Sequence, residues 1–386
     1  MRILLVFFIG FLSFFYLSDV LGRLTKGIKY SIGGMVLVLI GLLVGFFGKT
    51  FLAGGTNVLA AFFLIGSGFG LIFHHLLSRR FIFFEKLEKE FVIKHESAFE
   101  RILEILPGAF TWLALTSPIW LSFTLPYAVA YLILIADVYW LLSALRIGVL
   151  ILIGYKEMEY AKNQNWLKLL QTAYPLDFNR SYHLILIPTY KEALYILTST
   201  FASIIKSDYP KDRILLVIGF EQRDDPKKIK QTIKYLKKIE SKIGGIFTTI
   251  HPYGLSGEVA GQGSNKNWMI AHIVPQLKKK GIKLDDVFVT TLDADFSIHE
   301  QFLAGSLYKY LSLPANVRDK RTFTGVFLYH NNYWQTPTPM RLMAAGTSFW
   351  QMAEMVGSDK YMNYSSMSIS LKALLDIGGW IPDKVN

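Results

Sequence analysis

The apolar positions of this 386-residue chain change their pattern near residue 155. Before that point they form long unbroken runs, and after it they form short runs separated by segments with helical spacing. A helix needs about 20 consecutive apolar residues to cross a bilayer. Short apolar runs that alternate with amphipathic helices are typical of a soluble α/β domain. The pattern therefore predicts a transmembrane region at 1–155, an interfacial linker at 156–181 and a soluble domain at 182–386.

The first region contains enough apolar sequence for about five helices that cross a membrane. We expect spans at 3–18, 31–48 and 50–73, a fourth that ends before Pro126, and a fifth at about 127–153. The first run also has the length of a signal peptide, but no small-residue cleavage site follows it. Asp137 lies inside the fifth span. It is either a polar contact between helices or a functional carboxylate within the membrane.

Basic residues are concentrated in alternate connections between these spans. Lys and Arg are frequent after the first, third and fifth spans, whereas the other two turns share Lys49 alone. Cytoplasmic loops carry the excess of Lys and Arg. The chain is therefore expected to be an integral membrane protein, in the plasma membrane, with its N-terminus outside and its soluble domain in the cytoplasm.

Composition narrows the classes of partner. The formal net charge of +12 suits an anionic lipid surface. We expect no nucleic-acid partner, because the sequence has no aromatic–basic stripe and no DNA-reading motif. The absence of cysteine excludes disulfides, thiol catalysis and cysteine-based zinc sites. Two basic helical segments, 157–170 and 227–238, either contact the membrane surface or have a solvated face.

From His183 onward, short apolar strands alternate with helices. Strands are expected at 184–187, 214–220, 246–250, 287–292 and 322–329. Helices are expected at 190–206, 226–242, 265–280 and 340–355, with Ser264 as the N-cap of the third. This alternation is typical of βαβ units, so it predicts a mostly parallel sheet.

Two carboxylates follow the fourth expected strand. Asp293 and Asp295 are separated by one residue, directly after a buried apolar run. Close carboxylates repel each other unless a cation neutralises them. Hard divalent cations bind such oxygens and complete their coordination with phosphate and water. Taken alone, the pair also matches an ordinary solvated turn.

The other strands end in polar residues as well. Glu221 follows the second strand, and a glycine-rich loop at 257–265 leads into a helix, where backbone amides can approach a phosphate. The first strand ends in a turn containing Pro188, Thr189, Tyr190 and Glu192. The carboxyl ends of parallel strands lie at one edge of a sheet, where α/β proteins bind ligands. The order of these motifs therefore favours one nucleotide-binding edge over a set of separate surface turns.

These residues together resemble the membrane-associated glycosyltransferase family 2 enzymes, which have a GT-A fold. The resemblance covers about 182–386. It implies metal binding, to Mg²⁺ or Mn²⁺, by Asp293 and Asp295. It implies nucleotide-sugar binding by Pro188, Thr189, Tyr190, Glu192, Glu221, Gly263, Asn265 and Asp293. The segments 364–366 and 374–380 resemble the family's acceptor-side segment and its Gly-Gly-aromatic turn. The segment 330–334 also resembles the family, but its chemistry does not assign it a role.

The chain departs from the family pattern at two places. Gln262 stands where a Lys is common, which removes one expected phosphate-facing charge. The family's Glu-Asp motif, whose Asp is the catalytic base, is expected a few residues after Trp380, but no such pair occurs before Asn386. Asp383 is a weak substitute because it lies in a turn that precedes the base. We therefore leave the catalytic residue unassigned and expect the chain to be an N-terminal portion of a longer enzyme.

The resemblance implies inverting, metal-dependent transfer of a sugar from a nucleotide-sugar donor to a lipid-linked or polysaccharide acceptor at the cytoplasmic membrane face. One alternative is a membrane protein that binds a nucleotide-sugar without turnover. Another is a membrane scaffold. A transporter would also suit five spans and Asp137, although the long soluble region does not favour it.

Overall fold

The computed structural model describes residues 40, 63–67, 96–329, 331, 333–357 and 366–380. The chain forms two compact units, Met1–Lys156 with Leu328–Tyr361, and Glu157–Phe327 with Met362–Asn386. The first three expected spans lie outside the described residues, apart from residue 40 and a helical stretch at 63–67. His330, Asn332, the segment 364–365 and Asp383 also lie outside them.

The described part of the first unit is helical. It contains α5 (Glu96–Leu121), most of α6 (Pro126–Lys162), the short η7 (Tyr333–Gln335) and α14 (Thr338–Gly357). Among the described helices, Arg101–Leu121 and Pro126–Lys162 are long and apolar enough to cross a membrane, on length and composition alone. Gly154 of α6 lies against α14, where an added Cβ would be 2.3 Å from the Met352 carbonyl oxygen. Leu150, Ala353 and Val356 are buried beside this contact.

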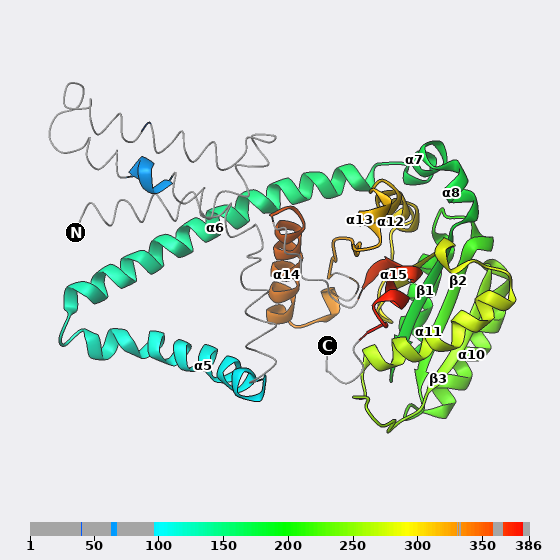
Figure 1. The fold of residues 1–386 in the computed structure, drawn as a ribbon, viewed down its shortest axis with the longest axis horizontal. Helices are drawn as coiled ribbons and strands as arrows, with labels where there is room; N and C mark the ends of the chain where they lie inside the picture. Colours follow the sequence, from blue (N-terminus) through cyan, green and yellow to red (C-terminus); the bar gives the residue numbers. More distant parts are fainter. Residues whose placement is uncertain are drawn as a thin grey trace. The chain divides into compact units, whose positions relative to one another are not determined.

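The second unit is built on a five-stranded sheet with the order β3-β2-β1-β4-β5 (Figure 1). The strands are β1 (Tyr182–Thr189), β2 (Ile214–Glu221), β3 (Gly245–His251), β4 (Val287–Thr291) and β5 (Met367–Ser370). The first four are parallel, and β5 pairs with β4 in the antiparallel direction. All residues of β2 and β4 are buried, as expected for central strands covered on both faces. The prediction of a mostly parallel α/β sheet is confirmed.

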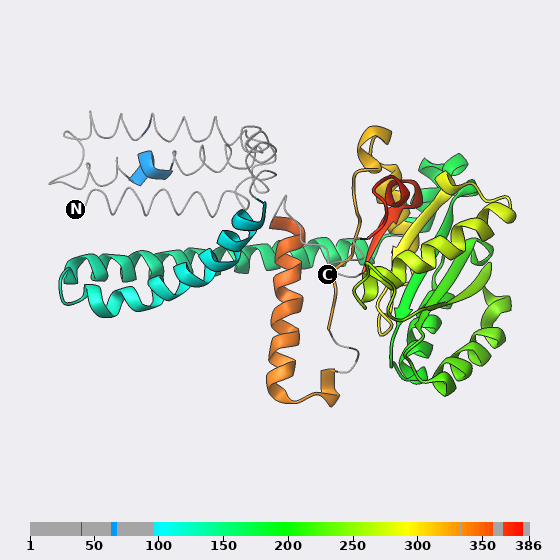
Figure 2. The same cartoon turned by 60° about the horizontal axis from the view of Figure 1, so that its bottom comes forward.

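Helices cover both faces of this sheet (Figure 2). One face carries α7 (Trp166–Ala173), α8 (Pro175–Arg180), α9 (Leu194–Lys206), α10 (Pro226–Ile239) and α12 (Phe302–Leu311) over one apolar core. The other carries α11 (Gln262–Lys279) and α15 (Leu371–Asp376) over a second core. The remaining short helices are η4 (Lys211–Arg213), η5 (Glu240–Lys242), η6 (Leu284–Asp286) and α13 (Ala315–Arg318).

The predicted linker helix is interrupted. Helix α6 continues to Lys162, and α7 starts at Trp166, where the Asn165 side chain accepts a hydrogen bond from the Lys168 amide and caps the helix. The apolar face of α7 packs within the second unit, because Leu170 is fully buried and Trp166 lies against Gly305 of α12. An added Cβ at Gly305 would be 3.1 Å from the indole, so the small residue permits this close approach.

Two local predictions were wrong. Ser264 is not an N-cap, because α11 already starts at Gln262 with Gly261 as its cap, and the Ser264 hydroxyl donates to the Val259 carbonyl instead. The segment 322–329 is not a strand, since Phe323 alone forms a bridge, with Ser368. The residues around Ser368 form β5, a strand that was not predicted and that pairs with β4.

Candidate functional site

The predicted site residues lie at the carboxyl edge of the sheet. Thr189 and Glu221 are the last residues of β1 and β2. Asp293 and Asp295 come two and four residues after the end of β4. The N-terminus of α11, which contains Gly263 and Asn265, follows β3. Because β1 to β4 are parallel, these positions share one edge, as in other open α/β sheets that bind ligands there.

The turn after β1 is held together by Glu192. Its Oε2 accepts a hydrogen bond from the Thr189 hydroxyl at 2.7 Å and another from the Tyr190 amide. The next residue, Lys191, has a φ of +67°, and its amide donates to Asp224 Oδ2 at 2.8 Å. Helix α9 consequently begins at Leu194, four residues later than its spacing predicted. Pro188 is buried within β1. Tyr190, the first residue after the strand, is partly exposed at the edge of the sheet.

Glu221 is a buried carboxylate that is paired with several neighbouring side chains. Its side chain is 5% exposed, and its Oε1 accepts a hydrogen bond from Asn265 Nδ2 at 2.8 Å. Arg223 Nε lies 3.6 Å from Oε2, and His251 Nδ1 lies 3.3 Å from Oε1. A buried charge is costly unless it is paired and hydrogen-bonded. Asn265 and Glu221, predicted separately, therefore form one network with two residues that the sequence analysis did not select.

Asn265 approaches β2 through a gap at Gly219. Its amide also donates to the Gly219 carbonyl at 3.1 Å. An added Cβ at Gly219 would be 2.3 Å from Asn265 Oδ1 and 2.4 Å from Met269 Sδ. The glycine therefore sets how closely α11 packs against the sheet. Gly263, on the first turn of the same helix, is buried.

The two aspartates after β4 differ in exposure. Asp293 is partly buried, its amide donates to Ser366 Oγ at 3.3 Å, and its Oδ1 accepts from Gln262 Nε2 at 3.3 Å. Asp295 is exposed. Between them, the Ala294 carbonyl accepts a hydrogen bond from the buried Thr200 hydroxyl at 2.7 Å. This contact fixes the backbone between the two carboxylates, so their separation is set by the fold.

Lys266 places a cation close to Asp293. The lysine is buried, and burial lowers its pKa to about 8, while the charge of Asp293 opposes that shift. Its ammonium lies 5.7 Å from the centroid of the Trp380 ring. Sequence reasoning missed Lys266 and looked for this charge at position 262. The sequence feature that could have identified Lys266 is a basic residue on the first turn of the helix that follows the glycine-rich loop.

The Gly-Gly-Trp turn is attached to the same helix. Asn267 Nδ2 donates to the Trp380 carbonyl at 2.6 Å, and the Trp380 amide donates to Asn267 Oδ1 at 2.9 Å. Gly378 and Gly379 have φ values of +80° and +87°, which favour glycine. At Gly379 an added Cβ would also be 2.4 Å from Asn267 Oδ1. The turn is therefore held against the first turns of α11, next to Lys266.

The carboxylate oxygens at this edge suit a divalent cation whose remaining coordination positions are filled by a bound ligand. Within the described ranges, no three or more His, Asp or Glu side chains gather into a metal-binding group. Mg²⁺ is commonly held by one or two carboxylates together with substrate phosphates. Asp293 and Asp295 match that donor set. They do not match a site built wholly from protein ligands, and metal binding stays a prediction.

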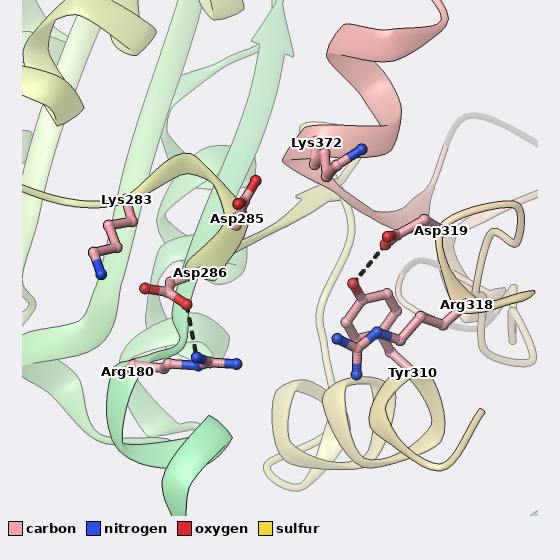
Figure 3. A pocket seen from close by; sticks show the side chains of 8 residues that line it. All are labelled: Arg180, Lys283, Asp285, Asp286, Tyr310, Arg318, Asp319 and Lys372. Atoms are coloured by element: carbon pink, nitrogen blue, oxygen red, sulfur yellow. Dashed lines mark hydrogen bonds and ion pairs between the residues drawn. The ribbon is translucent and has the colours of Figure 1, made fainter. Parts of the chain in front are cut away.

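A cavity of about 360 Å³ lies at the opposite edge of the sheet (Figure 3). Arg180 and Asp286, which precede β1 and β4, form an ion pair across 3.2 Å on one side of it. On the other side the Tyr310 hydroxyl donates to Asp319 at 2.7 Å, and burial together with that bond raises the tyrosine pKa to about 12. None of the predicted site residues lines this cavity.

No protein-family model matches the chain, and no curated protein matches it. Two solved structures that match are the mannosyltransferase PcManGT from Pyrobaculum calidifontis in complex with GDP-Man and Mn²⁺, and S. aureus TarS 1–349. The first is 16% identical over 61% of this chain and 56% of that chain, with a TM-score of 0.35. The second is 15% identical over 53% of this chain and 51% of that chain, with a TM-score of 0.29. The matched region spans about half the length of those solved chains.

Proposed function

We propose that this chain binds a nucleotide-sugar at the carboxyl edge of the sheet, as part of a membrane enzyme that transfers the sugar with inversion. The observation that carries the proposal is the pairing of Glu221 with Asn265 beside Asp293 and Lys266. A buried carboxylate, an amide and a buried cation meet there on the first turn of α11. Polar groups that converge at the carboxyl ends of parallel strands are typical of a ligand site.

Each group has a role that its chemistry suits. Tyr190 and Glu221 lie at the ends of β1 and β2, where an aromatic face and a carboxylate can contact a nucleoside. Asp293 and Asp295 would hold Mg²⁺ or Mn²⁺, which would neutralise charge on the departing diphosphate. Lys266 adds a further positive charge on the same side of the site. We assign no catalytic base.

Membrane attachment is proposed from the surface of the first unit. Trp112 on α5 and Trp140 on α6 are 71% and 68% exposed, among many exposed apolar side chains on both helices. Soluble proteins rarely expose large contiguous apolar patches. These helices would therefore lie in lipid, and the basic connections favour a cytoplasmic soluble domain. A lipid-linked or polysaccharide acceptor suits this location.

Calorimetric titration of the purified full chain tests donor binding. UDP- and GDP-sugars would each be titrated with and without Mn²⁺, beside an assay of sugar transfer to extracted membrane lipids and glycans. We expect binding of one nucleotide class that strengthens at least about tenfold with Mn²⁺. Binding without transfer would favour the non-catalytic alternative, and the absence of binding to every nucleotide-sugar would contradict the proposal.

A further inference from the structure

Helix α14 exposes its apolar face. Leu342, Gly346 and Phe349 follow one another at spacings of four and three residues, so they share one face of the helix. Leu342 and Phe349 are 70% and 50% exposed, and an added Cβ at Gly346 would meet no other atom within 4 Å. Gln351, on a different face, is 1% exposed. A surface helix of a soluble protein has the opposite arrangement, with its apolar stripe toward the core.

The polar side of α14 is covered by the chain segment that precedes the helix. Tyr329 donates its amide hydrogen to Ser348 Oγ at 3.2 Å, and Gln351 Nε2 donates to the Tyr329 hydroxyl at 3.3 Å. Buried polar groups are hydrogen-bonded in folded proteins, and these contacts meet that requirement. The side of the helix that remains exposed is therefore the apolar one.

The C-terminal half of α14 packs on α6 close to the end of that helix's apolar run. Gly154 lies against the Met352 carbonyl, and Leu150 is buried together with Ala353. The first charged residue of α6 after this contact is Lys156. Helix α6 has 37 residues, whereas about 20 cross the hydrocarbon, so it is long enough to extend beyond a bilayer. If α6 spans a membrane, it contacts α14 at the level where the span ends.

Helix α14 runs across α6 and not along it, in both views of the fold (Figures 1 and 2). A helix that crosses a membrane-spanning helix at the end of the span lies along the membrane surface. Helix α14 is not apolar enough to be a candidate span itself. Its Arg341 guanidinium lies 5.8 Å from the ring centroid of Trp334, which is 81% exposed. Arginine and tryptophan both suit the boundary between hydrocarbon and water.

The segment that contains α14 leaves and re-enters the second unit beside the aspartate pair. Phe323 and Ser368 form an antiparallel bridge, which brings the two ends of the segment together. The Thr324 hydroxyl donates to the Ser366 carbonyl at 3.1 Å, and Ser366 Oγ accepts from the Asp293 amide at 3.3 Å. A partner that holds α14 would therefore be linked through the chain, on both sides, to the backbone of Asp293.

We propose that α14 is an interfacial helix whose Leu342, Gly346 and Phe349 face the acyl chains of a lipid bilayer. Such helices bury their apolar face about 5–10 Å into the boundary between headgroups and hydrocarbon. The segment 328–361 then ties the aspartate edge of the sheet to the lipid surface. The inference rests on the proposed membrane attachment and extends it from the spanning helices to a helix that lies between β4 and β5 in the sequence.

Spin labelling of the full chain in lipid nanodiscs tests this. The sequence has no cysteine, so single-cysteine variants can be labelled without background. The collision rate of each label with oxygen, which dissolves in lipid, is compared with its collision rate with a polar nickel complex. We expect the oxygen-to-nickel ratio to be at least about fivefold higher for Leu342→Cys, Gly346→Cys and Phe349→Cys than for Thr347→Cys, because labels on opposite faces of an interfacial helix differ in depth.

Thr347→Cys is the matched control within the helix. The Thr347 hydroxyl bonds the Met343 carbonyl of its own helix, so its replacement removes no contact with another element through that group. Two labels outside α14 set the scale. Leu141→Cys, at an exposed position of α6, should have a lipid-like ratio, and Lys234→Cys, at an exposed position of α10, should have a water-like ratio.

Three results would overturn the inference. A ratio that changes steadily along α14, without alternation between its faces, would indicate a spanning helix. Low collision rates with both reagents would indicate a protein partner, such as a second copy of this chain. A water-like ratio at every α14 label would indicate a solvated helix. In each case a lipid-like ratio at Leu141→Cys would leave the proposed membrane attachment intact, whereas a water-like ratio at Leu141→Cys would overturn both.

Discussion

The two edges of the sheet carry charged residues in different ways. At the carboxyl edge, Glu221 is buried, and its partners come from β3 and α11. At the opposite, amino edge, the cations of the ion pairs are largely exposed: Arg180, paired with Asp286, is 60% exposed, and Lys372, paired with Asp376, is 49% exposed. Exposed ion pairs contribute little to stability, whereas a buried charge requires every one of its partners. The two edges therefore differ in how deeply their charged groups are buried and in how far those groups converge.

The strongest test of this comparison removes one carboxylate at each edge. Under the proposed function, Asp295→Asn should lower sugar transfer about a thousandfold, because stabilisation of the leaving group by a bound cation would be worth several kcal/mol. Asp285→Asn, at the opposite edge, should leave the rate within about twofold. Steady-state rates in membrane preparations measure both. Near-normal turnover in Asp295→Asn would contradict the assignment of the aspartate pair.

A buried histidine near the amino edge gives a second prediction. His183 is fully buried, and this burial lowers its pKa to about 3, with the Leu303 backbone opposing the shift. In the unfolded chain an ordinary histidine has a pKa of about 6.5. The unfolded state therefore takes up the proton first, so stability is complete above about pH 6.5 and falls as the pH decreases toward 3.

The expected slope below about pH 6 is up to about 1.4 kcal/mol per pH unit from this residue. His183→Phe should reduce the slope, because Tyr209 and Phe288 already surround the ring with aromatic edges. Denaturant unfolding at several pH values measures the effect. Equal slopes in His183→Phe and in the wild type would show that other groups govern acid stability.

The third prediction concerns the network at the carboxyl edge. Asn265→Ala should lower the free energy of unfolding by about 2 kcal/mol, since the Glu221 carboxylate and the Gly219 carbonyl would each lose a donor while remaining buried. Lys372→Ala should cause no measurable change, because its contact with Asp376 is at the surface. Equilibrium denaturation of both variants provides the comparison, and equal effects would contradict it.

The smallest expected effect is at the turn after β1. Lys191 has a φ of +67°, a region that is unfavourable for residues with a Cβ. Lys191→Gly should raise the stability by up to about 1 kcal/mol, whereas Lys191→Ala should have little effect, because it keeps the Cβ. Thermal unfolding distinguishes the two. If the alanine and glycine variants were equally stabilised, the side-chain charge of Lys191 would be the cause, and the backbone conformation would not.

Much of the sheet was predictable because its central strands are continuous apolar runs. The buried strands β1, β2 and β4 were assigned to within a few residues. Strand β5 was missed, since Met367–Ser370 is short and alternates with serines. The segment 322–329 was assigned instead, because its local composition resembles a strand. Which of the two pairs with β4 depends on long-range backbone hydrogen bonds.

Local sequence patterning was enough to predict which residues lie at the carboxyl edge of the sheet. Glu221 and Asp293 follow apolar strands directly, and the direction of a strand sends its last residues to that edge. The tertiary structure decided the partners of these residues. Asn265 is 44 positions from Glu221, and Lys266 comes near Asp293 only because α11 packs against β2 at Gly219. The physical reason is that strand ends follow from local apolar patterning, whereas partner choice depends on the packing of elements that are distant in the chain.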